Sequence, residues 1–205
     1  MKIKLDNINV NDYILNRYED GLIYFSLSTQ AIIKENYMES MYYSNKCKEK
    51  LLEDGNYKRI IYLNLNLFIC YSYFKNYEDC YELTKAQLLL LKSFKIEDDI
   101  KTQTLKYYLL SCLALEKYDE IISLIEEKQS ILITEFCEYL VALYKTNNEK
   151  YLQTLNETLN NSKNNDERIS ICKIMDEYLQ NNNKKILNDL KGLVLEVLIE
   201  LLKDK

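Results

Sequence analysis

The stretch YKRIIYLNLNLFICYSYF, residues 57–74, decides the fold class of this 205-residue chain. Its apolar residues recur at the i, i+3 and i+4 spacing of one helix face, namely Ile60, Leu63, Leu67, Cys70, Tyr71 and Phe74. Four more, Ile61, Leu65, Phe68 and Ile69, cover the other faces. A helix that is apolar nearly all round must be buried. The stretch therefore predicts a helix with neighbours on two sides.

The composition extends this prediction to the whole chain. There is no proline and there are only three glycines, so the turn residues that an all-β fold needs are missing. Helical periodicity predicts helices over residues 12–34, 37–53, 57–75, 77–93, 99–116, 118–128, 131–146, 149–160, 166–180 and 184–203. Joined by short polar turns, they form an all-α antiparallel array of helix pairs.

The connectors predict how the chain is divided. Gly55 in EDGN (53–56) suits the left-handed residue after a helix, and the carboxylates of KIEDD (95–99) suit the next helix's N-terminus. The most polar connectors are 160–167 and 180–185. We expect one continuous domain over 1–205, with a weak subdomain boundary near residue 162 that sets off 163–205 as C-terminal capping helices.

A short pattern recurs at the turns. In IIKENYMES, YFKNYEDCY and LEKYDEIIS an apolar helix end is followed by a charged or Asn turn, a tyrosine and a new helix. The tyrosines are Tyr37, Tyr77 and Tyr118, and NNEKYLQTL offers a fourth at Tyr151. The repeated unit is therefore a pair of helices.

The first unit resembles the tetratricopeptide repeat. Counting from Tyr24, an apolar residue follows at Leu27, and small residues follow at Ser28, Ala31, Ser40 and Ser44. The repeat-core positions of all units are Tyr24, Leu27, Ala31, Tyr37, Leu67, Tyr71, Tyr77, Cys80, Cys112, Tyr118 and Tyr151. The resemblance covers roughly residues 20–160. It implies a right-handed solenoid of about four to five helical hairpins, interlocked through small residues at close crossings.

The run GNYKRIIYLNLNLFICYSYFKNYEDCYELTKAQLLL, residues 55–90, also resembles the helical-repeat domains of Gram-positive regulators that bind peptide pheromones. That resemblance implies a concave groove that binds a short peptide, and a curvature that changes on binding. Residues 1–20 are too few for the helix-turn-helix head of those regulators, so we expect binding and oligomerisation rather than direct DNA reading. The abundance of Asn, Lys, Ile and Tyr fits an AT-rich bacterial or phage genome.

The first helix of each pair is expected to line this groove. The ligand-binding candidates are Tyr62, Asn64, Leu65, Asn66, Ile69, Ser72, Tyr73, Gln103, Lys106 and Leu110. Tyrosine offers a rigid ring with a polar tip, and an asparagine amide can both donate to and accept from a peptide backbone. The alternative interpretation is that the tyrosines are core residues and that the asparagines reflect composition alone.

The last predicted helix, in 184–205, has a broad apolar arc that includes Leu190, Val194, Val197, Leu198 and Leu201. It either caps the stack internally or pairs with a second copy in a homodimer, and internal packing is the favoured alternative. Gly192 within this helix suggests a close helix crossing.

Several kinds of function are excluded by what the sequence lacks. A net charge of −5 opposes nucleic-acid binding, and no 18-residue apolar run or cleavable leader indicates a membrane or secretory protein. We therefore expect a cytoplasmic protein. The six cysteines form no C-x-x-C pair and no histidine completes a metal site, so we expect free, mostly buried thiols and no metal.

Missing residue types also make catalysis an unfavoured interpretation. Without histidine the commonest general base at neutral pH is missing, and the three glycines cannot form a phosphate-binding loop. The favoured hypothesis is a non-enzymatic regulatory or adaptor module, without cofactors, that binds a peptide or protein segment on its concave face. The alternative is a phage- or mobile-element-encoded inhibitor or structural protein that acts through its terminal helix or convex face.

Overall fold

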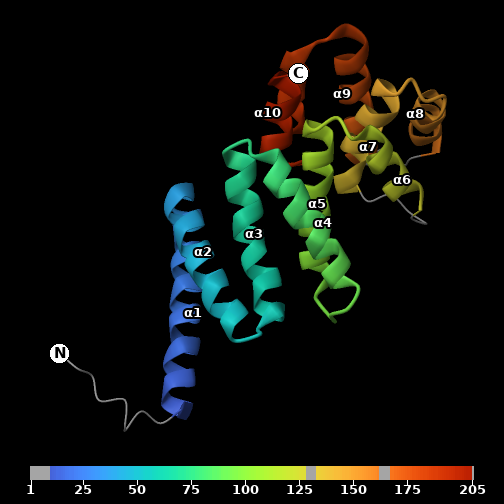
Figure 1. Cartoon of the computed structure of the whole chain (residues 1–205). Coiled ribbons are helices and arrows are strands. Elements are labelled where there is room, and N and C mark those ends of the chain that lie inside the picture. The colour runs from blue at the N-terminus through green and yellow to red at the C-terminus, as the bar shows by residue number, and fades with distance from the viewer. Residues whose placement is uncertain (1–9, 128–132, 162–166, 205) are drawn as a thin grey trace. The chain divides into compact units, whose positions relative to one another are not determined.

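The computed structural model describes residues 10–127, 133–161 and 167–204 (Figure 1). Their helices are α1 (Val10–Ile33), α2 (Tyr37–Glu53), α3 (Tyr57–Tyr73), α4 (Tyr77–Leu91), α5 (Asp98–Ala114), α6 (Tyr118–Glu126), α7 (Ile133–Lys145), α8 (Lys150–Asn161), α9 (Glu167–Asn181), the 3-10 helix η2 (Lys184–Leu190) and α10 (Glu196–Asp204). No strand occurs in these three ranges, where one isolated bridge joins Lys191 to Val194. The all-α helical-repeat class is confirmed.

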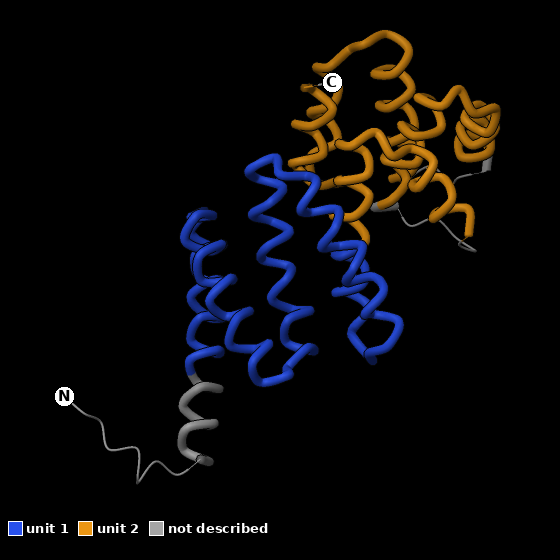
Figure 2. The backbone as a smooth tube through the Cα atoms, viewed as in Figure 1, with its two compact units in different colours: residues 1–104 blue, residues 105–205 orange. Residues whose placement is uncertain are grey.

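The chain divides into two compact units, residues 1–104 and 105–205, coloured separately in Figure 2. The division falls within α5, whose first residues belong to unit 1. The boundary that the polar connectors suggested, near residue 162, lies outside the described residues.

In unit 1, α2 packs on α1, α3 packs on α2, and α4 packs on α3, while α3 also contacts α1. The central helix α3 thus has neighbours on two sides, as its sequence predicted. Ile61, Leu63 and Phe68 of α3 are completely buried. Ile61 joins a cluster with Leu91 and with residues that follow α4, so the core continues along the stack.

One turn design joins the helices of unit 1. After α1, Glu35 has φ 57°, and the Asn36 amide donates to the Ala31 carbonyl at 2.9 Å. The Asn36 side chain then accepts a hydrogen bond from the Glu39 amide, which caps α2. One asparagine therefore closes one helix with its backbone and starts the next with its side chain.

The same turn is used twice more in this unit. Asn56 and Asn76 donate to the carbonyls of Leu51 and Tyr71, each at 2.8 Å, and each caps the helix that follows. As a result, α2, α3 and α4 each begin at the tyrosine that directly follows the capping asparagine, namely Tyr37, Tyr57 and Tyr77. Tyr37 and Tyr77 were predicted from the recurring turn pattern, whereas Tyr57 was not among the repeat tyrosines; its turn carries Gly55 at the left-handed position.

The same turn backbone follows α5 and α7 in unit 2. After α5 it is followed by a tyrosine at the repeat position, and after α7 it is not. Tyr118 is the first residue of α6 and follows Glu116, whose φ is 60°. After α7 the left-handed residue is Asn147, and the Asn148 amide donates to Leu143 at 2.9 Å. By this alignment Tyr151 lies two residues later than a repeat tyrosine, so its predicted register was wrong.

The C-terminal end departs most from the prediction. The single helix expected over 184–203 is replaced by η2, a turn and α10. Gly192 has φ 81° and is exposed, with no atom within 4 Å of a Cβ built on it, so the predicted close crossing at Gly192 is wrong. The glycine serves a chain reversal instead.

The reversal buries the apolar arc within unit 2. Leu190 and Leu198 are completely buried and Leu201 is 8% exposed, whereas Val194 and Val197 are half-buried. The Tyr178 hydroxyl donates to the Leu202 carbonyl at 2.8 Å and thereby satisfies an acceptor at the end of α10. The arrangement agrees with internal packing, and the homodimer is not needed to cover these side chains.

The left-handed residue at the α1–α2 turn gives a first prediction. A residue with a side chain is disfavoured there by about 1 kcal/mol, a cost that glycine avoids. We therefore expect Glu35→Gly to raise the free energy of unfolding of unit 1 by about 0.5–1 kcal/mol. Gly55→Ala is the matched control and should lower it by a similar amount, because Gly55 has φ 67° and open space around it. Urea unfolding curves that move in the same direction for both variants would contradict this account of the turn.

Candidate functional site

A buried polar network ties α1, α2 and α3 together. Asn66 on α3 donates through Nδ2 to the Ser28 hydroxyl at 2.9 Å and to the Thr29 hydroxyl at 3.2 Å, both on α1. Ser28 also lies within hydrogen-bond distance of two serines on α2, Ser44 at 2.7 Å and Ser40 at 3.2 Å. These small residues are the ones that the sequence placed at the helix crossing, and all three serines are completely buried.

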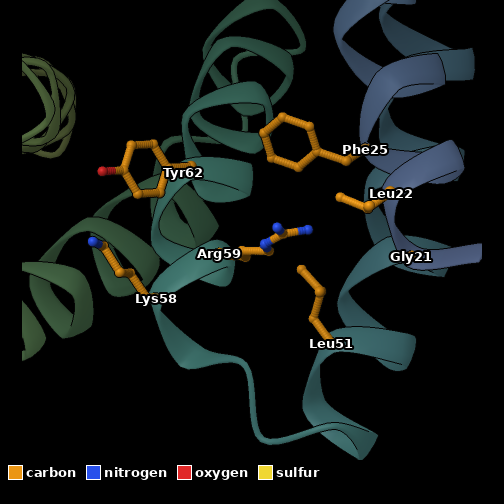
Figure 3. A pocket seen from close by; sticks show the side chains of 7 residues that line it. All are labelled: Gly21, Leu22, Phe25, Leu51, Lys58, Arg59 and Tyr62. Carbon is orange, nitrogen blue, oxygen red and sulfur yellow. The ribbon is translucent and has the colours of Figure 1, made fainter. Parts of the chain in front are cut away.

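One helical turn before this network, α1 and α3 leave room for a pocket of about 390 Å³. It is lined by Gly21, Leu22 and Phe25 of α1, Leu51 of α2, and Lys58, Arg59 and Tyr62 of α3. In Figure 3 the Arg59 side chain extends from α3 toward Leu22 and Phe25. A volume of this size falls within the range of about 300–1,000 Å³ that is usual for ligand pockets.

A cysteine lies behind the pocket and is not reactive. The Cys47 thiol donates to the Gly21 carbonyl at 3.2 Å. Burial raises the pKa of Cys47 to about 11, against the opposing effect of the Arg59 charge. A thiol of that pKa stays protonated at neutral pH. All six cysteines are free and buried, which confirms the predicted state of the thiols.

An apolar stripe leads along α3 away from the pocket. Tyr62, Leu65 and Ile69 are half-buried and Tyr73 is 59% exposed. Their spacing of three and four residues places them on one side of the helix. The stripe ends where the Tyr73 ring lies 4.0 Å from the Tyr37 ring, measured between centroids. The structure thus brings together four of the predicted groove residues.

Tyr62 is the residue that the stripe and the pocket share. Besides lining the pocket, it packs against the cluster that contains Ile61 and Leu91. Burial raises the pKa of the Tyr62 hydroxyl, and the nearby Glu97 carboxylate, which accepts its hydrogen bond, adds to the rise. The hydroxyl is therefore oriented by a contact within unit 1.

Three residues of α3 that were predicted to bind a ligand in the groove, Asn64, Asn66 and Ser72, are instead buried. Asn64 is 3% exposed, and its Nδ2 donates to Gln87 Oε1 at 2.8 Å. Asn66 is used in the serine network, and Ser72 is 2% exposed. A signal was available in the sequence, because Asn64 lies four residues after Ile60 and three before Leu67, on a face already predicted to be buried.

The candidates on α5 have mixed outcomes. Gln103, in unit 1, is half-buried. Lys106 and Leu110 belong to unit 2, where Lys106 is half-buried and Leu110 is completely buried. Leu110 is therefore a core residue, and its assignment to a binding surface was wrong.

Sequence reasoning missed most of the pocket. Leu22, Phe25, Leu51, Lys58 and Arg59 were not among the candidates. Leu22 and Phe25 are spaced three apart on α1, on the other side of the helix from Tyr24, Leu27 and Ala31, and this second apolar face was the available signal. That α3 lies opposite it could be learned only from the fold.

Unit 2 holds a different unpredicted feature, two buried carboxyl groups on α7. Glu135 and Glu138 are each 1% exposed. Burial raises the pKa of Glu138 to about 8, the Glu135 charge adds to the rise, and Lys106 opposes it. Glu138 Oε2 has no hydrogen-bond partner. Within the described ranges no three Asp, Glu or Cys side chains are grouped as a metal site would require.

None of the helices in the described part of the chain is long and apolar enough to cross a bilayer. Comparisons of the sequence with protein-family models and with curated proteins, and of the structure with solved structures, find no match.

Proposed function

We propose that this chain is a non-enzymatic adaptor or regulatory module that binds a peptide or protein segment on the α1–α3 side of unit 1. The observation that carries the proposal is the continuity of the α3 stripe, from Tyr73 through Ile69 and Leu65, with the pocket at Tyr62. Bound segments are held mainly by a few apolar anchors that enter such pockets.

The lining of the pocket suits noncovalent binding. Phe25, Leu22 and Leu51 offer apolar walls to an anchor side chain, and the charged groups belong to Lys58 and Arg59. The resemblance to pheromone-binding regulators points the same way, toward a short peptide ligand in the cytoplasm of a bacterial or phage-infected cell. The alternative of an inhibitor that acts through its last helix has less support, because Leu198 and Leu201 are buried in unit 2.

The proposal is tested by selecting peptides on the whole chain. Random 16-residue peptides, displayed as N-terminal fusions on phage, are selected against the wild-type protein, and dissociation constants are measured by fluorescence polarisation. Leu22→Glu should weaken the selected peptides at least tenfold, because a buried apolar side chain contributes roughly 1.5–3 kcal/mol.

Leu90→Glu is the matched control. Leu22 is 40% exposed on α1 and Leu90 is 39% exposed on α4, and Leu90 does not line the pocket. Both substitutions replace a partly exposed leucine of unit 1 by glutamate. A difference between their dissociation constants therefore reports on the pocket. Failure to select any peptide, or equal weakening by both variants, would refute the proposed function.

A further inference from the structure

We infer that the segment bound here is acidic, with an apolar side chain in the pocket and an Asp or Glu side chain next to it in sequence. The inference rests on the proposed function and names the chemistry of its ligand. It follows from the charges that surround the pocket, since two of its seven lining residues, Lys58 and Arg59, are cations and the other five are uncharged.

The lining of the pocket is positively charged, whereas the chain as a whole has a net charge of −5. Arg59 is half-buried and extends between α3 and α1, where apolar walls from Leu22 and Phe25 reduce the screening of its charge by water (Figure 3). A guanidinium carries five N–H donors, so Arg59 can keep its contacts within the protein and still donate to an incoming carboxylate.

Lys58 also lines the pocket, and its side chain projects to the other side of α3 from Arg59 (Figure 3). It is exposed, and in Figure 3 its ammonium group lies on the same side of α3 as the Tyr62 hydroxyl. Glu97 interacts with that hydroxyl and so places a negative charge on this side of α3. Glu97 therefore limits the positive region on the side away from α1, so the ligand's carboxylate is expected at Arg59, with Lys58 adding its charge from the other side of α3.

The acidic group is assigned to a side chain rather than to a chain end. The apolar stripe continues beyond the pocket through Leu65 and Ile69 to Tyr73, so a segment that follows it is expected to run across the pocket. An internal Asp or Glu beside the anchor then reaches Arg59 and lies within the field of the Lys58 charge. This choice can be tested because peptides in the N-terminal display format have no free C-terminus.

The peptides selected on the wild-type chain provide the test. We expect enrichment of an apolar residue within two positions of Asp or Glu. Replacing that acid by its amide in synthetic, C-terminally amidated peptides should weaken binding about tenfold at low salt, and less in 0.5 M NaCl because salt screens exposed charges. Lys58→Glu should weaken the acidic peptides about fivefold, as expected for an exposed ion pair.

Charge reversal supplies the controls. A peptide with Lys in place of its acid should bind Lys58→Glu better than it binds the wild type. Lys92→Glu, at an exposed lysine that follows α4, should change nothing. Peptides that depend on Leu22 but are indifferent to the acid, or that bind only with a free C-terminus, would overturn the inference and leave the proposed function standing. Peptides that do not depend on Leu22 would remove the proposed function itself.

Discussion

Unit 2 should lose stability as the pH rises from about 5 to 8, because Glu138 must become charged where water cannot reach it. The carboxyl group is 1% exposed, its Oε2 has no hydrogen-bond partner, and its pKa is raised to about 8 from the ordinary 4.5. Between those two values the folded protein binds a proton that the unfolded chain releases. The free energy of unfolding must therefore fall as pH increases through this window.

The size of the effect follows from the difference between the two pKa values. Each unit corresponds to about 1.4 kcal/mol, so the stabilisation that is fully present below pH 4.5 decreases by roughly 4–5 kcal/mol once the pH exceeds 8. The neighbouring Glu135 raises the pKa of Glu138 further, and Lys106 offsets part of that rise. The group that sets the window is Glu138.

Glu138→Gln removes the titrating proton and keeps the shape of the side chain. Between pH 6 and pH 9 the stability of this variant relative to the wild type should rise by about 2–3 kcal/mol. Amide hydrogen exchange of α7 and α9, read by mass spectrometry, measures the opening of this unit without assuming that both units unfold together.

Glu149→Gln serves as the control, since Glu149 is exposed in the turn before α8. Its stability should follow that of the wild type at every pH. If Glu138→Gln also follows the wild type from pH 6 to pH 9, the Glu138 carboxyl is not held neutral by burial and the account of α7 fails.

The fold was predictable because its determinants are local. The apolar pattern of residues 57–74 predicted a central helix with two sets of neighbours, and α3 has them. The recurring tyrosines predicted where new helices begin, and Tyr37, Tyr77 and Tyr118 are each the first residue of a helix. A helix cap and the left-handed residue before it depend only on about six neighbouring residues, so both can be recognised from the sequence.

The buried polar residues were not predictable in the same way. An asparagine in an apolar helix can face solvent, or it can be buried if a partner is supplied. For Asn64 that partner is Gln87, and for Asn66 it is Ser28, on helices far away in the sequence. Similarly, the break at Gly192 depends on the burial of Leu187 and Leu190, which the helical period of residues 184–203 does not reveal.

Most of the pocket was not predictable for a related reason, and of its lining residues only Tyr62 was among the candidates. Tyr62 and Leu65 were identified from their place on a first helix, which is a local property. Leu22 and Arg59 belong to the pocket only because α1 and α3 lie opposite each other, and that offset is set by the contact of Asn66 with Ser28 and Thr29. A polar network that seemed to be part of the binding surface is what positions that surface.

The second large effect is expected at Phe68, a core residue of α3 that is not part of the stripe. Its side chain is completely buried, and Phe68→Ala should lower the free energy of unfolding of unit 1 by about 3–5 kcal/mol, through lost apolar burial and the cavity left behind. Exchange protection of the amides of α2, α3 and α4 is the measurement, because these helices pack directly on one another.

Phe74→Ala is the matched control at the end of the same helix. Phe74 is 39% exposed and keeps only part of its ring against neighbours, including an edge contact with Tyr73 at 5.3 Å, so its loss should cost about 1 kcal/mol or less. Because Phe68 lines neither the pocket nor the stripe, Phe68→Ala should weaken peptide binding only as far as it unfolds unit 1. If both phenylalanine variants lose the same stability, α3 is not the central helix of this unit, and neither the core nor the pocket beside Tyr62 is arranged as described.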